Sequence, residues 1–277
     1  MGNKEWKYYN HAAIPKKSPL TNPNLTDIKN GNIWNLSGKP LLARWTTDFD
    51  CGYQTNWWYI IKDKPFDINE LNSKKRYEIR KGRKNFCVKE IVLDSFKEEL
   101  FEIHKSALMT YSQVNKQLIN KEKFIKSIEN WRNLTILGAF YNETQQMVGY
   151  AMLTKDDDKY LQFNVLKVIP QYEKYAINAA IVDGILTYYE NFLKTGGIIC
   201  DGARSINHET NFQGYLEKYF NFRKAYCNLH IEYNPKIKWA VTLLYPIRRI
   251  LKKFDQNKFI HNINSVLLME EFIRGKL

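Results

Sequence analysis

The sequence predicts an α/β (α+β) fold in which helices cover a mixed β-sheet. The chain has 277 residues, of which 44% are hydrophobic, enough for a substantial core. Three apolar runs between residues 134 and 170 have the spacing of consecutive antiparallel strands. On either side of them, apolar residues recur alternately at helical and at strand spacing. Strands, helices and strands in this succession are typical of a mixed sheet layered with helices.

The first part of the chain gives the weakest pattern. Residues 1–38 are rich in Asn, Pro, Lys and Gly, which predicts an extended arm with one short strand at 33–36. Two strands are expected next, within 40–47 and 53–62. After Pro65, Asp67 and Glu70 resemble a capping box, so we expect a helix from there to about Asn85.

The middle of the chain is the most regular. It predicts a strand, two helices, three antiparallel strands, a helix, a strand, a helix and a strand. Their expected ranges are 86–93, 94–112, 120–131, 134–142, 147–155, 159–170, 175–192, 198–200, 211–219 and 222–233. After Pro235 two further helices are expected, the first of them bent or broken at Pro246.

Charge and cysteine content narrow the functional classes. The net charge of +13 favours polyanionic partners such as nucleic acid, phosphorylated cofactors or an anionic membrane, although lysines spread over a solvated surface would give the same total. The four cysteines are widely spaced, so we expect no metal site. The polar N-terminus lacks the apolar core of a signal peptide, which predicts a cytoplasmic protein. Trp6 stands where a myristoylation signal needs Ser or Thr, and no run reaches the ~20 apolar residues of a membrane span.

Four segments together resemble a known superfamily. A long strand ends in Val168-Ile169-Pro170 and is followed directly by a helix. The other segments are the basic stretch 70–91, GGIICDGA at 196–203 and YLEKYFNFRKAY at 215–226. Over residues 86–233 this order resembles the acyl-CoA-dependent acyltransferases of the GNAT superfamily. More closely, it is similar to the Fem-type branch, the aminoacyl transferases that build peptidoglycan bridges, and to related uncharacterised acyltransferases.

The resemblance implies an organisation and a reaction. It implies a degenerate N-terminal GNAT-like half at 1–85 that ends in a basic helix, an acyltransferase domain at 86–234 and a C-terminal helical extension at 235–277. The implied reaction is direct acyl transfer to an amine. Such a reaction needs a groove for the donor, a hydrogen-bond donor to the carbonyl oxygen and a route for two protons.

The resemblance also places an acyl-CoA. Its arm would follow the main chain of 164–168, and its pyrophosphate would lie at the N-terminus of the next helix. Ala176 keeps the small side chain of the family's turn, whereas Glu173 and Asn178 depart from it. A one-sided shift would instead put Gln171 in the first place of the turn and Lys174 in its glycine place. The implied cofactor-binding residues are Asn164, Val165, Leu166, Lys167, Val168, Gln171, Lys174, Tyr175, Ala176 and Asn178.

Four side chains are candidates for proton transfer. Asp201 follows a short buried-type strand, where a carboxylate either faces a cleft or caps its own Asp-Gly turn. His208 follows in a polar loop as a general base or a solvated side chain. Tyr215 and Tyr219 are candidates for protonating the leaving group, or form one packed stripe on a helix. Cys200 has apolar neighbours, which predicts a buried, inert thiol.

Substrate contacts are expected in three places. Arg76 and Arg80, with Arg83, share a face of the basic helix and suit phosphate groups, unless that face is simply solvated. Trp58 could stack on a sugar or belong to the core. The segment 237–253 combines apolar and basic residues, which suits a helix at a membrane surface or a helix packed over the two halves.

These observations favour an N-acyltransferase that uses acetyl-CoA or another acyl-CoA. Its expected acceptor is a small-molecule or lipid-linked amine on a sugar or cell-envelope precursor. A first alternative is a Fem-like transferase that uses aminoacyl-tRNA, with tRNA as a partner. A second is a GNAT-shaped protein that binds a partner or the inner face of the membrane without catalysis.

Overall fold

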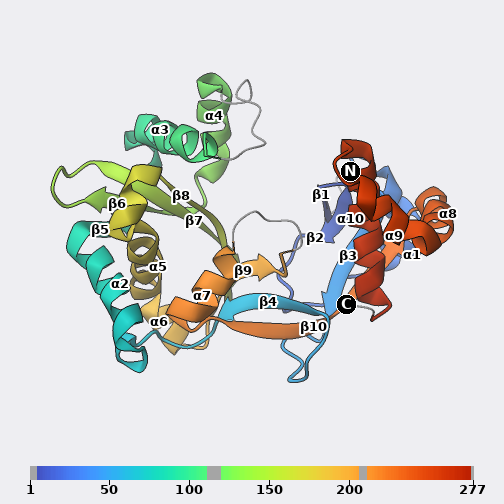
Figure 1. Ribbon diagram of the computed structural model, residues 1–277, viewed down its shortest axis with the longest axis horizontal. Coiled ribbons are helices and arrows are strands. Elements are labelled where there is room, and N and C mark those ends of the chain that lie inside the picture. Colours follow the sequence, from blue (N-terminus) through green and yellow to red (C-terminus); the bar gives the residue numbers. More distant parts are fainter. Residues whose placement is uncertain (1–4, 111–119, 206–210, 276–277) are drawn as a thin grey trace. The chain divides into compact units, whose positions relative to one another are not determined.

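The computed structural model describes residues 5–110, 120–205 and 211–275 (Figure 1). The chain forms two compact units. The central unit is the continuous segment Ile60–Arg223, and the terminal unit combines Met1–Tyr59 with Lys224–Leu277. The chain passes between the units within strand β4 (Trp57–Lys62) and at the start of β10 (Arg223–Tyr233). The α/β class predicted from the sequence is confirmed, with mixed strand pairing in each unit.

The central unit is built on a sheet in the strand order β9-β8-β7-β6-β5. The four strands from β5 to β8 pair antiparallel, and β9 pairs parallel to β8. The bounds are β5 Phe86–Glu90, β6 Thr135–Tyr141, β7 Met147–Asp157, β8 Tyr160–Val168 and β9 Ile198–Ala203. The predicted run of three antiparallel strands is therefore present.

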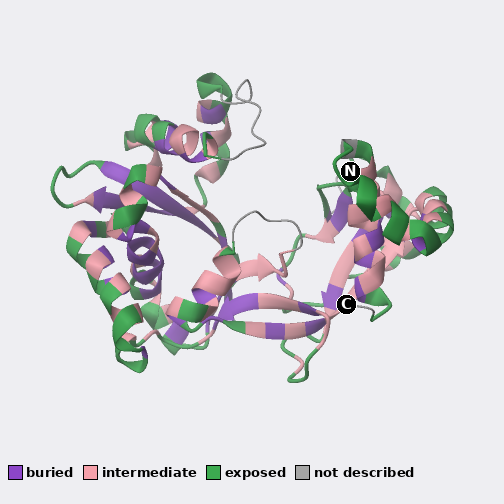
Figure 2. Ribbon diagram, viewed as in Figure 1, coloured by how far each residue is buried: buried purple, intermediate pink, exposed green. Residues whose placement is uncertain are grey.

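Helices cover both faces of this sheet (Figure 1). One face carries α3 (Lys97–Leu108) and α4 (Lys121–Ile128), whose apolar residues join Ile136, Tyr150 and Met152 of the sheet in one core cluster. The other face carries α5 (Ile177–Tyr188) and α6 (Glu190–Lys194). Buried residues concentrate in β6, β7 and α5, as Figure 2 shows. Helices on both faces of the sheet thus hold β8 and its neighbour β9 in place.

Helix α2 (Ser73–Asn85) begins later than the sequence suggests. The Asp67 carboxylate accepts a hydrogen bond from the Asn69 N–H at 2.8 Å, but it caps only the 3-10 turn η2 (Ile68–Glu70). Asn72 is the residue that caps α2, since its side-chain oxygen accepts from the Lys75 N–H at 3.1 Å. Both positions carry a capping side chain, and burial of Leu71 between them separates the two helical segments.

Shorter elements complete the central unit. A 3-10 helix, η6 (Pro170–Tyr175), lies between β8 and α5. Helix α7 (Phe212–Phe220) follows β9 and fits its expected range within one residue. Single 3-10 turns form at η3 (Leu93–Ser95) and η5 (Glu129–Trp131).

The terminal unit contains strands in the order β1-β2-β3-β10-β4. Strands β1 (Trp6–Tyr9) and β2 (Ala12–Pro15) form a hairpin, β2 runs parallel to β3 (Leu42–Thr47), and β3 pairs antiparallel with β10. The expected extended arm is therefore a hairpin that belongs to the sheet. The strand expected at 33–36 is wrong: Gly31, with φ of 72°, precedes a 3-10 turn, η1 (Asn32–Asn35), that buries Ile33.

Helices of both chain ends cover this second sheet. A short helix, α1 (Thr26–Lys29), precedes η1. After β10, α8 (Pro235–Leu244) ends just before Pro246, where the expected interruption is a 3-10 turn, η7 (Tyr245–Ile247). Helical turns then follow without a gap as α9 (Arg248–Leu251) and η8 (Lys252–Phe254). The last helix is α10 (Lys258–Ile273). Val241, Tyr245 and Leu267 from these helices form one core cluster with Leu42 and Tyr233.

The compact units differ from the division at 85/86 and 234/235 that the sequence suggests. The basic helix α2 packs on α5 and so belongs with the central sheet. The C-terminal helices pack with strands of the first sixty residues rather than forming a separate extension. Both differences come from contacts between residues far apart in the sequence.

Candidate active site

The strands β8 and β9 pair along only part of their length. Their register runs from Tyr160 opposite Ile198 to Gln162 opposite Cys200 and ends there. β8 continues to Val168 and β9 to Ala203. In the described part of the chain, no strand pairs with residues 164–168 on the side that β9 leaves. Among the described residues this edge of β8 is therefore not covered by a strand, and an extended ligand can add to such an edge.

A β-bulge lies at this edge of β8. Met152 of β7 pairs with Val165 and Leu153 pairs with Phe163, so that Asn164 is an extra residue. The Asn164 side chain is exposed and its amide donates a hydrogen bond to the Thr154 hydroxyl. A bulge interrupts the ladder and bends the strand, so β8 turns at the point where β9 leaves it.

Asp201 lies on β9, one residue beyond the last pair with β8. Burial raises the pKa of its carboxyl to about 7, while a hydrogen bond from Gln213 acts in the opposite direction. Gln213 of α7 also fixes the chain that follows, since its amide donates to the Ala203 carbonyl at 3.0 Å and its oxygen accepts from the Ser205 N–H at 3.1 Å. Asp201 is thus a positioned carboxyl that titrates near neutral pH.

Tyr215 and Tyr219 lie together on α7. Their rings are 4.9 Å apart, and the ring of Phe212 lies 6.0 Å from Tyr215 and 5.9 Å from Phe163 of β8. Burial, followed by the charge of Glu78, raises the pKa of Tyr215. The two rings pack together on α7, and the Tyr215 hydroxyl stays protonated at neutral pH.

Two histidines belong to this part of the chain. His208 lies outside the described residues. The sequence does not single out His104 of α3. Its ring centroid lies 4.7 Å from that of Phe124 in a tilted arrangement, and burial, followed by the charge of Lys167 of β8, lowers its pKa. A neutral imidazole thus lies near the far end of β8. Only its position among the apolar residues of α3 could have drawn attention to it.

The turn between β8 and α5 is closed by its own hydrogen bonds. The Tyr172 N–H donates to the Ile169 carbonyl at 3.0 Å, and the Ala176 N–H donates to the Glu173 carbonyl at 2.9 Å. Ala176 has φ of 66°, a conformation that glycine adopts most easily, and the residue is 3% exposed. Two of the N–H groups that a pyrophosphate could use are therefore already engaged.

Helix α2 covers this turn. A Cβ added to Gly82 would lie 2.9 Å from the Ala176 carbonyl oxygen and 2.9 Å from the Ala180 nitrogen. The turn also carries the exposed carboxylate of Glu173, and Lys174 lies over the Tyr175 ring at 5.0 Å. Gln171 is exposed and Asn178 half-buried at the first turn of α5. A pyrophosphate needs open N–H groups and close approach, so this turn fits one poorly.

The basic face of α2 divides into two parts. Arg83 forms a two-pronged ion pair with Asp183 of α5, with both N–O distances at 2.7 Å. Arg76 and Arg80 form no ion pair with any residue that the structure describes. Trp58 belongs to the terminal unit, where Lys224 lies over its ring at 4.6 Å and Tyr226 packs against its edge. Arg76 and Arg80 thus remain available to an anionic ligand.

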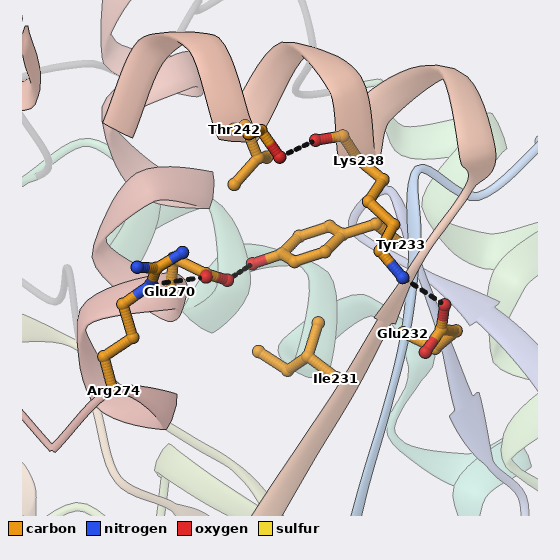
Figure 3. A pocket seen from close by; sticks show the side chains of 8 residues that line it. Ile231, Glu232, Tyr233, Lys238, Thr242, Glu270 and Arg274 are labelled. Carbon is orange, nitrogen blue, oxygen red and sulfur yellow. Dashed lines mark hydrogen bonds and ion pairs between the residues drawn. The ribbon is translucent and has the colours of Figure 1, made fainter. Parts of the chain in front are cut away.

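A separate pocket of about 230 Å³ lies in the terminal unit (Figure 3). Glu270 accepts hydrogen bonds from the Tyr233 hydroxyl at 2.9 Å and from Arg274 at 2.7 Å, and Lys238 pairs with Glu232 at 3.5 Å. The charged groups of the pocket neutralise one another, and their hydrogen bonds and ion pairs connect β10 with the C-terminal helices.

Over the ranges described, no group of three or more His, Cys, Asp or Glu could hold a metal ion.

The Cys200 prediction agrees with the structure. Its thiol is fully buried, and burial raises its pKa to about 12. No described helix is long and apolar enough to cross a bilayer.

Solved structures resemble this arrangement of strands and helices. FemX aligns with 85% of this chain and 85% of its own chain, at 7% sequence identity and a TM-score of 0.52. The chain has a Fem-like GNAT fold. The C-terminal domain of a putative lysylphosphatidylglycerol synthetase from Agrobacterium fabrum is also similar. The alignment covers 86% of this chain and 84% of the domain, at 9% identity and a TM-score of 0.51.

A more distant match covers less. A protein of unknown function from Bacteroides thetaiotaomicron aligns with 73% of this chain, which spans 65% of that protein, at 11% identity and a TM-score of 0.44. Neither the protein-family models nor the curated proteins give a match to the sequence. Within the Fem-like GNAT fold, β8 is the strand that ends in V-x-P, and α5 is the helix that follows it.

Proposed function

We propose that this protein transfers an activated acyl group to an amine, without a covalent intermediate on the protein. The parting of β8 and β9 after Gln162 and Cys200, with Asp201 at that point, carries the proposal. An extended donor can add to the open edge of β8 by main-chain hydrogen bonds. N–H groups of the same edge are suited to stabilise the carbonyl oxygen as it gains negative charge.

The proposed chemistry follows from the titration of two groups. The amine nitrogen attacks the acyl carbon, and the bond to the sulfur or oxygen of the donor then breaks. Asp201, with a pKa of about 7, is partly ionised at neutral pH and accepts the proton that the amine loses. Tyr215 stays protonated and gives a proton to the leaving group. The resulting thiol or hydroxyl departs uncharged.

Two donors are proposed, and the turn before α5 bears on the choice. Acetyl-CoA is the donor that the superfamily resemblance suggests. The alternative is an aminoacyl-tRNA, which is supported by the internally bonded turn at Ala176 and by its cover at Gly82. The unpaired Arg76 and Arg80 suit the phosphates of a nucleic acid. We therefore place aminoacyl-tRNA first and acetyl-CoA second.

The acceptor is proposed as an amine on a small molecule, a sugar or a lipid-linked cell-envelope precursor. The name of the Agrobacterium fabrum protein refers to a lipid product, lysylphosphatidylglycerol, which supports a lipid-linked acceptor by likeness of fold. A protein that binds such a molecule without acylating it is the remaining alternative.

Donor binding separates these proposals. We expect aminoacyl-tRNA to bind with a strong salt dependence, and replacement of Arg76 and Arg80 by alanine to lower the slope of log K against log salt by about two. The matched control is Lys123→Ala with Lys126→Ala, two exposed cations on α4. Calorimetry with acetyl-CoA is expected to show no binding at millimolar concentration. Micromolar acetyl-CoA binding, with equal tRNA binding by both double variants, would reverse the order of the donors.

Catalysis needs a separate test. We expect Asp201→Asn to lower acyl transfer by about 10²-fold or more while the variant still binds the donor. Unchanged transfer would remove Asp201 from the mechanism. If neither donor binds and Asp201→Asn has no cellular effect, the non-catalytic alternative is favoured.

A further inference from the structure

The segment 235–254 carries apolar side chains on its outer surface. It runs almost continuously as helix through α8, η7, α9 and η8. Five large apolar residues are separated by four, four, three and four positions, which places them on one helical face. We call them the outer apolar stripe: Trp239, 74% exposed, Leu243, 68%, Ile247, 43%, Ile250, 58%, and Phe254, 57%.

The stripe is not the part of this segment that builds the core. The opposite side contributes Val241 and Tyr245, with Leu244 and Leu251 beside them, to the cluster that contains Leu267. The segment is therefore apolar on two sides, whereas a surface helix normally turns a polar side to water. A contiguous exposed apolar stripe of this kind marks an interaction surface.

The charge of this segment indicates what kind of partner the outer apolar stripe would bind. Residues 235–254 contain six Lys or Arg and no Asp or Glu. Two of the six are used within the unit: Arg248 pairs with Glu271 at 2.5 Å and Lys238 with Glu232 at 3.5 Å. Lys236, Arg249 and Lys253 are exposed and form no ion pair with a described residue. An apolar stripe among unpaired cations suits an apolar surface bordered by anions.

We propose that the outer apolar stripe seats this protein on an anionic lipid bilayer, with the helical segment parallel to the surface. The apolar side chains would enter the acyl boundary, and the unpaired cations would meet the lipid phosphates. Trp239 and Phe254, at the two ends of the stripe, suit the interfacial layer. A second copy of the chain is a poorer occupant, because it would bring a second uncompensated basic segment against the first.

Vesicle binding by the full chain tests the proposal. Vesicles of phosphatidylcholine alone are compared with vesicles that contain about 30% phosphatidylglycerol. The anionic lipid gives the second set a negative surface potential. We expect binding to the anionic vesicles and loss of binding at high salt. Leu243→Ser with Ile250→Ser should weaken that binding at least tenfold, because each removes apolar area that enters the bilayer. Arg249→Gln with Lys253→Gln should weaken it by about fivefold per cation.

Controls distinguish lipid binding from altered folding or self-association. Val92→Ser with Tyr53→Ser removes two equally exposed apolar side chains elsewhere and should bind vesicles like the unmodified protein. Because the stripe lies outside the core, its variants should keep the unmodified melting temperature. Equal vesicle binding by the stripe variants would overturn the proposal. So would a dimer in solution that Leu243→Ser converts to a monomer, since a second copy would then be the occupant.

Discussion

The Arg83–Asp183 pair predicts an asymmetric response to mutation. The guanidinium meets the carboxylate through two hydrogen bonds of 2.7 Å, and thereby ties α2 to α5. The two partners differ in exposure: the Asp183 side chain is 8% exposed and the Arg83 side chain 49%. Removal of the arginine therefore leaves a buried carboxylate, whereas removal of the carboxylate leaves a cation that water can reach.

The exposure of each side chain sets how much stability its replacement costs. Breaking a fully buried ion pair costs about 3–5 kcal/mol. Because half of the Arg83 side chain is in water, its attraction to Asp183 is screened, and we expect Arg83→Ala to cost about 2–3 kcal/mol. Asp183→Asn keeps an oxygen that accepts one hydrogen bond from Arg83 and should cost about 1 kcal/mol. The double variant should be more stable than Arg83→Ala, because a neutral amide needs no cation.

Urea unfolding followed by circular dichroism measures these differences. Lys84→Ala is the matched control, since Lys84 is the next residue of α2, is exposed and forms no ion pair with a described residue. We expect this control to change the free energy of unfolding by less than about 0.5 kcal/mol. Equal costs for Arg83→Ala and Asp183→Asn would refute the argument from burial, as would a value for Arg83→Ala within error of the control.

Three further predictions concern the site and its surroundings. Because burial raises the pKa of Asp201 to about 7, the rate of acyl transfer should rise with pH through that value, and Asp201→Asn should lose this dependence. The free energy of unfolding, measured at each pH, should fall as pH rises from about 4 to about 7, because the folded state holds a proton that the unfolded state has released. Gly82→Ala should destabilise by about 1–3 kcal/mol in thermal melts, because its Cβ would meet the Ala176 carbonyl oxygen and the backbone of Ala180 in α5. A gain in stability would contradict this packing. In a thiol-labelling time course, exposed Cys87 should react before Cys200, whose pKa is about 12, and fast labelling of Cys200 would show that β9 opens.

Much of the fold could be predicted from local pattern. The strands β6 and β7 begin with long apolar runs, and β8 mixes apolar and polar residues; polar turns separate the three strands, a pattern that favours antiparallel neighbours. The break at Pro246 follows from the missing N–H of proline. The first forty residues could not be predicted this way. Ala12 and Ala13 are too small to signal a buried strand, and their burial depends on pairing with Leu42 and Ala43.

The candidate site shows the same limit. Asp201 stands out in the sequence because a charged residue follows directly on an apolar strand. Gln213 and His104 do not, since their roles depend on which strands their helices cover. Arg83 gives no local sign that it differs from Arg76, yet its partner Asp183 lies a hundred residues further along the chain. Contacts of that range cannot be derived from spacing.

The split composition of the terminal unit has a consequence for the order of folding. Strand β3 reaches its partner β10 only after the whole central segment has been synthesised, because Leu42 pairs with Tyr233. The central segment is continuous in sequence, so its sheet can form before β10 has been synthesised and while β3 is still unpaired. A collapsed central unit shortens the effective loop between the two ends, which lowers the entropy cost of joining them. A mutation that loosens the central unit would therefore also delay the terminal unit and leave β1, β2 and β3 exposed as unpaired edges on the growing chain.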